Sequence, residues 1–121
     1  MIGVGLDLVD IQRFREVLAR RPSLHQRLFT DGELALAAAR RDPVPALAVR
    51  FAAKEAVMKA LGVGLGAFSF QEVEVLKRDS GAPELRVTGG AAALAERQGV
   101  SQWHVSISHS VATAGAVVSA L

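Results

Sequence analysis

The 121-residue chain contains no cysteine, and this absence removes several kinds of chemistry at once. Disulfides, thiolate metal sites and cysteine nucleophiles are excluded together. No apolar run approaches the roughly 18 residues that a membrane-spanning helix needs. The first ten residues, MIGVGLDLVD, have no basic leader, and Asp7 interrupts their apolar run, so they are not typical of a secretion signal. We therefore expect a cytoplasmic protein that does not act at a membrane.

The motifs of common hydrolases are missing as well. The chain contains no HxxH, HExxH or GxSxG, so neither a zinc enzyme nor a serine hydrolase has support. The net charge of +2 is too small to indicate a nucleic-acid-binding protein.

The positive charge is nevertheless unevenly distributed. Between Leu8 and Thr30, five arginines stand against only two acidic residues: Arg13, Arg15, Arg20, Arg21 and Arg27 against Asp10 and Glu16. A local basic excess suits an acidic protein or a phosphorylated ligand. An ordinary exposed helix rich in arginine would look the same.

The length suits one compact domain over residues 1–121. Half of the residues are hydrophobic, which is enough for a core, although a chain this short often gains by burying surface in an oligomer. The hydrophobic pattern predicts strands over 2–9, 68–78, 83–89, 103–109 and 113–120, and helices over about 11–21, 31–41, 46–61 and 90–98. This order predicts an α+β fold with a largely antiparallel sheet packed on one long helix.

The long predicted helix contains an oddity in the stretch FAAKEAVMK. On a helical wheel Leu47, Phe51, Met58 and Leu61 share one arc, with Lys54 inside that arc and Glu55 at its edge. Ordinary explanations exist, since Lys54 could bury its stem and keep its ammonium in water. Glu55 and Lys59 are spaced i, i+4 and could form a helix salt bridge.

Asp7 is a second oddity, because it interrupts an apolar strand. Its face of the strand also carries Gly3 and Gly5, which have no side chains, so we expect the carboxylate to border a space that a ligand could fill. A structural role as a cap or an acceptor of backbone N–H groups is the alternative.

Taken together, these charges favour a ligand site. Burying a charge costs several kcal/mol unless it is paired or bound to a metal. Asp7 and Glu55 suit Mg²⁺, which commonly takes one or two protein carboxylates together with water and substrate phosphates. Lys54 and Lys59 suit those phosphates. Weaker candidates are His109, at the end of the strand WHVSISH, and the glycines of GVGLG, which a helix cap and a turn explain equally well.

Three sequence motifs together indicate a known protein family. GVGLDLVDIQRF, RFAAKEAVMKALGVG and HVSISHS, in this order, resemble holo-[acyl-carrier-protein] synthase, the small bacterial type of 4′-phosphopantetheinyl transferase. The resemblance runs almost from end to end. It implies transfer of the phosphopantetheine arm of coenzyme A to a serine of apo acyl carrier protein, in fatty acid biosynthesis, with release of adenosine 3′,5′-bisphosphate. It also implies a homotrimer with active sites at the subunit boundaries.

The resemblance assigns roles residue by residue. The Asp of GxD and the Glu of KE match Asp7 and Glu55 as magnesium ligands, and Lys59 matches a lysine that grips the pyrophosphate. Glu55 and Lys59 are thus the expected catalytic residues, with either Glu55 or a water molecule as the base. The expected coenzyme A contacts are Arg50, Lys54, Lys59, Gly62 and His109, and Arg13 is expected to bind the acidic carrier protein.

Two positions depart from the family pattern. Val9 stands where the larger two-domain members carry a third acidic ligand, so water is expected there. Ala82 stands where many relatives have a basic residue, which removes one expected contact to coenzyme A. The alternative function is a non-catalytic basic adaptor that binds an acidic protein, but it leaves Asp7 and Glu55 unexplained. A nucleotide-binding fragment built on GVGLG is weaker, because phosphate loops usually follow a strand and open a helix.

Overall fold

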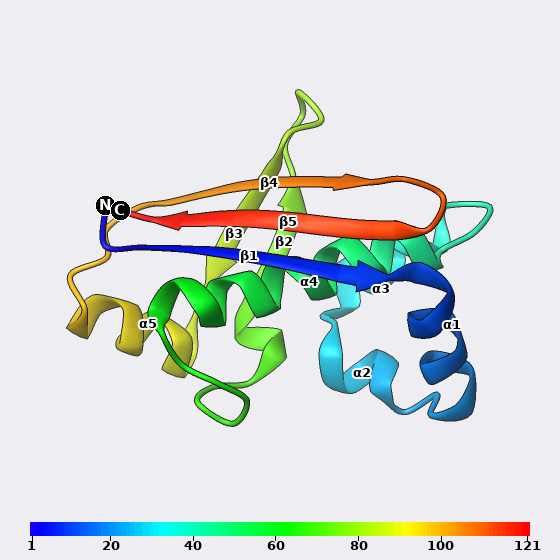
Figure 1. Cartoon of the computed structure of the whole chain (residues 1–121), viewed down its shortest axis with the longest axis horizontal. Coiled ribbons are helices and arrows are strands. Elements are labelled where there is room, and N and C mark those ends of the chain that lie inside the picture. The colour runs from blue at the N-terminus through cyan, green and yellow to red at the C-terminus, as the bar shows by residue number, and fades with distance from the viewer.

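A three-stranded antiparallel sheet lies over one long helix in the computed structural model, which describes all of residues 1–121 (Figure 1). The strand order is β1 (Gly3–Asp10), β5 (Thr113–Ala120) and β4 (Trp103–His109), and the helix is α4 (Val44–Leu61). A separate antiparallel pair joins β2 (Val73–Lys77) to β3 (Pro83–Val87). The predicted α+β fold is confirmed, with its strands divided between two sheets.

Shorter helices surround these elements. They are α1 (Ile11–Arg20), α2 (Leu24–Leu28), α3 (Asp31–Ala38), α5 (Gly89–Arg97) and the 3₁₀ turn η1 (Phe70–Glu72). None of the helices is both long enough and apolar enough to cross a bilayer.

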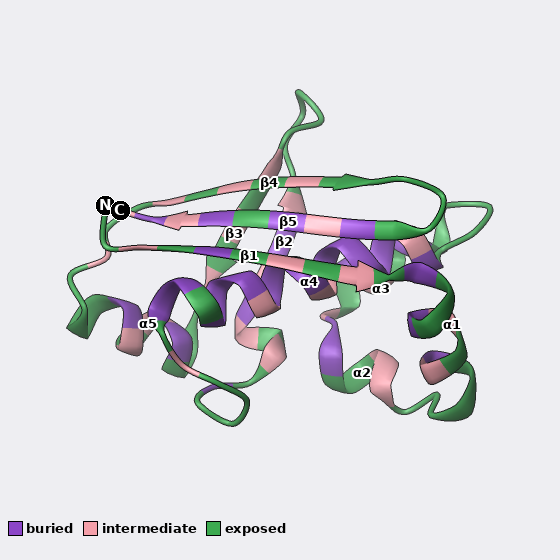
Figure 2. Ribbon diagram, viewed as in Figure 1, coloured by how far each residue is buried: buried purple, intermediate pink, exposed green.

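The three-stranded sheet has two different faces (Figure 2). Successive strand residues point to opposite faces, and on β5 Ala114, Ala116, Val118 and Ala120 are all buried against the core. The opposite face of β1 carries large apolar side chains that stay exposed. We call this exposed set the outer sheet face: Ile2, Val4, Leu6, Leu8 and Val117.

Glycine lets β1 approach α4 with no side chain between them. A Cβ atom at Gly3 would lie 2.0 Å from the carbonyl oxygen of Ala60, and one at Gly5 would lie 1.9 Å from that of Ala56. The expected ligand space beside these glycines is therefore wrong, because the backbone of α4 fills it. The same close approach sets Asp7 of β1 beside the face of α4 that carries Glu55 and Lys59.

Local signals fix most helix ends. The Asp10 side chain accepts a hydrogen bond from the N–H of Arg13 at 2.8 Å and so caps α1, as expected. Thr30 and Glu33 form a reciprocal capping box at the start of α3. Gly62 ends α4 in the left-handed conformation, with φ of 69°, which is also as expected.

Several predicted boundaries differ from the structure. The helix α2 was not expected, and α3 ends at Ala38 rather than near residue 41. The long helix starts at Val44, because Pro45 is tolerated in a first helical turn whose N–H groups have no partner anyway. The strand expected from residue 68 starts at Val73, since Ser69 and Glu72 form a capping box that folds η1 instead.

The two chain ends lie side by side. The N–H of Ile2 donates to the carbonyl of Ala120 at 2.7 Å, and Gly3 is the register partner of Ala120. Figure 1 shows both ends at the edge of the molecule opposite α1.

Candidate active site

A groove of about 940 Å³ runs between the second half of β1, α1, α2 and the loop after α4. Asp7 and Glu55 both line it, and Arg13 lies on the same lining. Its floor contains a row of aromatic rings: Phe14 stacks on Phe51 at 5.1 Å, and Phe51 stacks on Phe70 at 5.7 Å between ring centroids. The groove thus combines two carboxylates with a large apolar surface.

Asp7 is held by a lysine of α4. Its side chain is only 16% exposed, and its Oδ1 accepts a hydrogen bond from the Nζ of Lys59 at 3.0 Å. The same Nζ donates to the carbonyl of Leu6 at 2.9 Å. Lys59 therefore pairs with the strand across the helix–sheet contact and does not form the helix salt bridge with Glu55 considered above.

Glu55 lies half-buried without a hydrogen bond from Lys59. Burial raises the pKa of Glu55, the negative charge of Asp7 raises it further, and the Lys59 ammonium opposes both. Two carboxylates thus share the positive charge of one lysine. A site with excess negative charge and oxygen donors suits a divalent cation.

The donor set, two carboxylates, is one that suits Mg²⁺. No group of three or more His, Cys, Asp or Glu side chains is arranged to hold a metal. Two carboxylates with room for water and phosphate oxygens are the usual protein contribution to a magnesium site. Asp7 and Glu55 would be the protein ligands.

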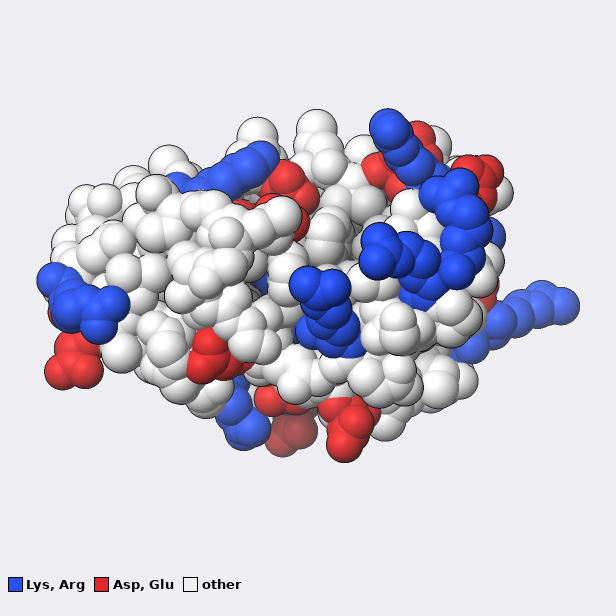
Figure 3. Space-filling model, turned by 90° about the horizontal axis from the view of Figure 1, so that it is seen from below, with Lys and Arg blue, Asp and Glu red and all other residues white.

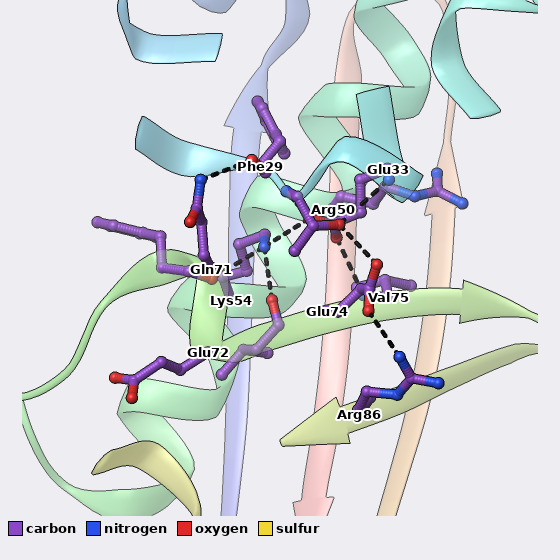
Figure 4. A network of polar contacts seen from close by, with 12 residues as sticks. Phe29, Glu33, Arg50, Lys54, Gln71, Glu72, Glu74, Val75 and Arg86 are labelled. Carbon is purple, nitrogen blue, oxygen red and sulfur yellow. Dashed lines mark hydrogen bonds and ion pairs between the residues drawn. The ribbon is translucent and has the colours of Figure 1, made fainter. Parts of the chain in front are cut away.

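Lys54 lies in the interior, away from the groove (Figure 4). Its side chain is 0% exposed, and its Nζ donates to the Oε1 of Glu33 at 2.7 Å, to the carbonyl of Phe70 at 2.9 Å and to the carbonyl of Val73 at 2.5 Å. An ammonium has three N–H donors, so none remains for a phosphate. The expected contact of Lys54 with coenzyme A does not fit this arrangement, and we omit it from the proposed site.

Arg50 and His109 line a second pocket, of about 200 Å³, that shares no residue with the groove. Arg50 is 5% exposed, and its Nη1 donates to the carbonyl of Ala46 at 3.0 Å. Its Nε is buried without a hydrogen-bond partner. Because Arg40 and Lys77 line the same pocket, it is a basic site with an unused buried donor.

The remaining expected residues lie at the edges of these sites. Arg13 is exposed on the groove lining, whereas Gly62 ends α4 and lines neither the groove nor the basic pocket. The structure therefore brings Asp7, Glu55, Lys59 and Arg13 to one region and places Arg50 with His109 in another.

Sequence reasoning missed several residues in and around these sites. The most important is Glu33, 2% exposed, which lines neither the groove nor the basic pocket but is the partner of Lys54. The motif TDGE at 30–33 is a capping-box signal and could have located the helix start, but it does not reveal that the carboxylate is buried. Arg40 and Lys77 of the basic pocket had no signal, because they meet Arg50 only in the folded chain.

Comparison with known proteins identifies the family of this chain. The family model described as "4'-phosphopantetheinyl transferase superfamily" matches residues 3–119. The chain belongs to this superfamily. A holo-[acyl-carrier-protein] synthase of Streptomyces avermitilis is 52% identical to this transferase over 118 residues, which are 98% of this chain and 95% of that protein.

Solved structures of similar proteins support the same family assignment. The holo-[acyl-carrier-protein] synthase of Neisseria meningitidis matches this transferase with a TM-score of 0.91 and 33% identity, over 100% of this chain and 98% of that one. The enzyme of Helicobacter pylori, solved in complex with coenzyme A, matches with a TM-score of 0.85 and 28% identity, over 98% and 99%. The resemblance that the three motifs carry is confirmed, and the adaptor alternative is not favoured.

Proposed function

We propose that this chain is a holo-[acyl-carrier-protein] synthase that moves phosphopantetheine from coenzyme A to a serine of apo acyl carrier protein, in fatty acid biosynthesis. The observation that carries the proposal is that Asp7 and Glu55 line one groove, with Lys59 paired to Asp7, in a chain of this superfamily. The predicted cytoplasmic location stays a prediction.

The reaction exchanges one phosphorus–oxygen bond for another. The serine oxygen bonds to the phosphorus that carries pantetheine, and the bond from that phosphorus to the bridging oxygen of the pyrophosphate breaks. Mg²⁺ held by Asp7 and Glu55 would neutralise charge that develops on the leaving group. Lys59, which is 54% exposed at its side chain, is free enough to donate to the pyrophosphate oxygens as well as to Asp7.

We propose Glu55 as the group that removes the serine proton. Burial and the charge of Asp7 raise the pKa of Glu55, which makes its carboxylate a stronger base than that of an ordinary surface glutamate. A water molecule in the groove is the alternative base. Either way, protonation of Glu55 at low pH removes a negative charge that the site needs.

Arg50 and His109 enter the site through a neighbouring copy of the chain in this proposal. They line the basic pocket, which is separate from the groove, so one subunit alone does not place them beside Lys59. We propose that the basic pocket of one subunit faces the groove of the next in a homotrimer. The outer sheet face supports an oligomer, because monomers rarely expose a contiguous apolar patch of this kind.

Basic side chains in and beside the groove suit an acidic carrier protein. Lys and Arg side chains gather at the α1–α2 end of the molecule (Figure 3). Arg13 and Arg27 belong to the groove lining next to its apolar floor. We propose that the acidic carrier docks there, with its charges on the arginines and its apolar side chains on the floor.

The test is a transfer assay with purified components. The protein is mixed with coenzyme A, Mg²⁺ and an apo carrier protein, and intact-mass spectrometry follows the carrier. We expect a mass gain of one phosphopantetheine that disappears with EDTA and in a Glu55→Gln variant. A carrier that keeps its mass in the complete mixture, or the same gain in the presence of EDTA, would contradict the proposal.

A further inference from the structure

Lys54 and Glu33 form a fully buried ion pair that the proposed chemistry does not use (Figure 4). The side chains are 0% and 1% exposed, and 2.7 Å separates the Nζ from the Oε1. A buried pair is weak evidence for stability, because removing both charges from water can cost more than their attraction returns. What the pair holds in place is therefore the more informative question.

The pair joins three parts of the chain that are distant in sequence. Lys54 belongs to α4 and Glu33 to α3, and both reach the segment 70–75. Lys54 donates to the carbonyls of Phe70 and Val73, while the Oε2 of Glu33 accepts from the N–H of Val75 at 2.9 Å. Without the pair the carbonyl of Val73 and the N–H of Val75 would be left without a partner in the interior, and the carbonyl of Phe70 would keep only the N–H of Val73.

Segment 70–75 begins at Phe70, whose aromatic ring lines the groove. The Phe70 carbonyl is 2.9 Å from the Nζ of Lys54, and the Phe70 ring stacks on Phe51 with an angle of 21° between the ring planes. Phe51 stacks in turn on Phe14 of α1. All three rings line the groove, so the position of η1 on α4 determines the shape of the groove floor.

We propose that Lys54 is a positioning residue: through Glu33 and the Phe70 carbonyl it fixes the aromatic floor of the groove for the carrier protein. In this role Lys54 would contact neither coenzyme A nor the reacting atoms, because its ammonium donates only to groups of the protein interior. The inference rests on the proposed function, because it takes the groove as the docking site of the carrier.

Two variants test this role. Lys54→Met removes the ammonium and leaves the Glu33 carboxylate buried and unpaired, so we expect this variant to lose stability. The double variant Glu33→Met/Lys54→Met leaves no buried charge but still removes the side-chain hydrogen bonds to the carbonyls of Phe70 and Val73 and to the N–H of Val75. Leu94→Ala is the matched control, because Leu94 of α5 packs on the core and does not line the groove.

Three measurements separate the possible roles. Steady-state kinetics give the KM for apo carrier protein, calorimetry gives the Kd for coenzyme A, and hydrogen exchange reports on the amides of residues 69–75. Because each variant loses hydrogen bonds to a charged group, we expect the KM for carrier to rise about tenfold in both. The Kd for coenzyme A should stay within about twofold of the wild type, and exchange in 69–75 should accelerate, whereas Leu94→Ala should show neither change.

The outcomes are distinct from those of the transfer assay. Transfer by the wild-type protein tests the proposed function, and only the variants test the role of Lys54. Weaker binding of coenzyme A with an unchanged KM for carrier would make Lys54 a phosphate ligand after all. A lower melting temperature with wild-type kinetic constants, as expected for Leu94→Ala, would reduce the pair to a purely structural role. If Lys54→Met does not fold, a wild-type KM in the double variant overturns the proposal.

Discussion

Glu55 illustrates at the scale of one residue how a functional group can oppose stability. The folded chain places its carboxylate in a half-buried site beside Asp7, and both burial and the neighbouring charge raise its pKa. A raised pKa means that the folded state disfavours the charged form relative to the unfolded chain. Glu55 therefore weakens the fold at neutral pH, where it must be ionised for the proposed chemistry.

Glu55→Gln should accordingly raise the melting temperature at pH 7 while lowering transfer by at least about 100-fold. The direction of this change in melting temperature follows from the linkage between protonation of Glu55 and folding. Below pH 4.5, the ordinary pKa of a glutamate, the carboxyl is protonated in both states, so the variant and the wild type should melt alike. The difference should develop as the pH rises from 4.5 to the raised pKa of Glu55 and should stay constant above it. Thermal melts from pH 4 to 8 measure it, and a variant that melts below the wild type at pH 7 would contradict this account.

Neighbouring residues on one helix show what sequence can and cannot predict. Lys54 and Glu55 were both expected to face a ligand, because a helical wheel places each of them near the apolar arc. Successive residues lie about 100° apart, so in the folded chain Glu55 lines the groove while Lys54 points into the core. Lys54 is buried because it pairs with Glu33, which lies on another helix, and the helical wheel of α4 alone does not show that partner.

At the scale of elements, the contact between β1 and α4 places the carboxylates. Gly3 and Gly5 allow backbone to approach backbone, and this approach brings the Nζ of Lys59 to 3.0 Å from Asp7. The sequence predicted the strand and the helix, and it marked Asp7 as a candidate ligand. It suggested a ligand space beside the glycines because an absent side chain looks the same whether a ligand or a helix fills its place.

Gly5→Ala should therefore be costly. Its Cβ would lie 1.9 Å from the Ala56 carbonyl oxygen, and backbone atoms must shift to accept it. We expect a loss of about 3 kcal/mol in the free energy of unfolding, at the upper end of overpacking effects, together with reduced transfer as Asp7 moves away from Lys59. Urea denaturation and the transfer assay measure the two effects.

Gly64→Ala is the matched control. A Cβ there would have no heavy atom within 4 Å, and Gly64 does not adopt a left-handed conformation. Its free energy of unfolding should change by less than about 0.5 kcal/mol. Equal losses at positions 5 and 64 would show that the close approach of β1 to α4 is not what determines stability here.

Other element boundaries depended on weak local signals. The helix α2 has only five residues, no side-chain cap hydrogen bond and a single buried residue, Leu28, so its sequence carries almost no periodic pattern. In contrast, the helix ends at Asp10 and Gly62 were predicted, because a cap and a left-handed glycine are chemical requirements of the terminus itself.

For the whole molecule, the outer sheet face is the feature that a single subunit leaves unexplained. Val4 is 58% exposed and Leu8 is 67% exposed on a strand whose other face packs on α4. Sequence alone indicated an oligomer through chain length and family resemblance, but alternation along the strand did not reveal which face a partner would cover.

Val4→Lys should separate the subunits if this face forms the proposed oligomer. A charge in an apolar interface has no partner, so light scattering after size-exclusion chromatography should show a smaller species. Transfer should fall with it, because the basic pocket would no longer meet the groove. Ala93→Lys, at an exposed position of α5, should change neither mass nor transfer. A Val4→Lys protein with wild-type mass and activity would exclude this face as the interface.

The meeting of the N- and C-terminal residues at one edge has a practical consequence for linking the enzyme to its substrate in a single polypeptide. A carrier domain fused to either terminus would start its tether at the edge opposite α1, whereas the groove lies beside the last four residues of β1. Asp7 lies four residues along β1 from Gly3, which is roughly 14 Å of strand. A tether that delivers its serine to Asp7 of the same subunit must bridge at least about that distance, which takes at least about four extended residues. Fusions with shorter tethers should modify carriers on neighbouring chains instead of their own.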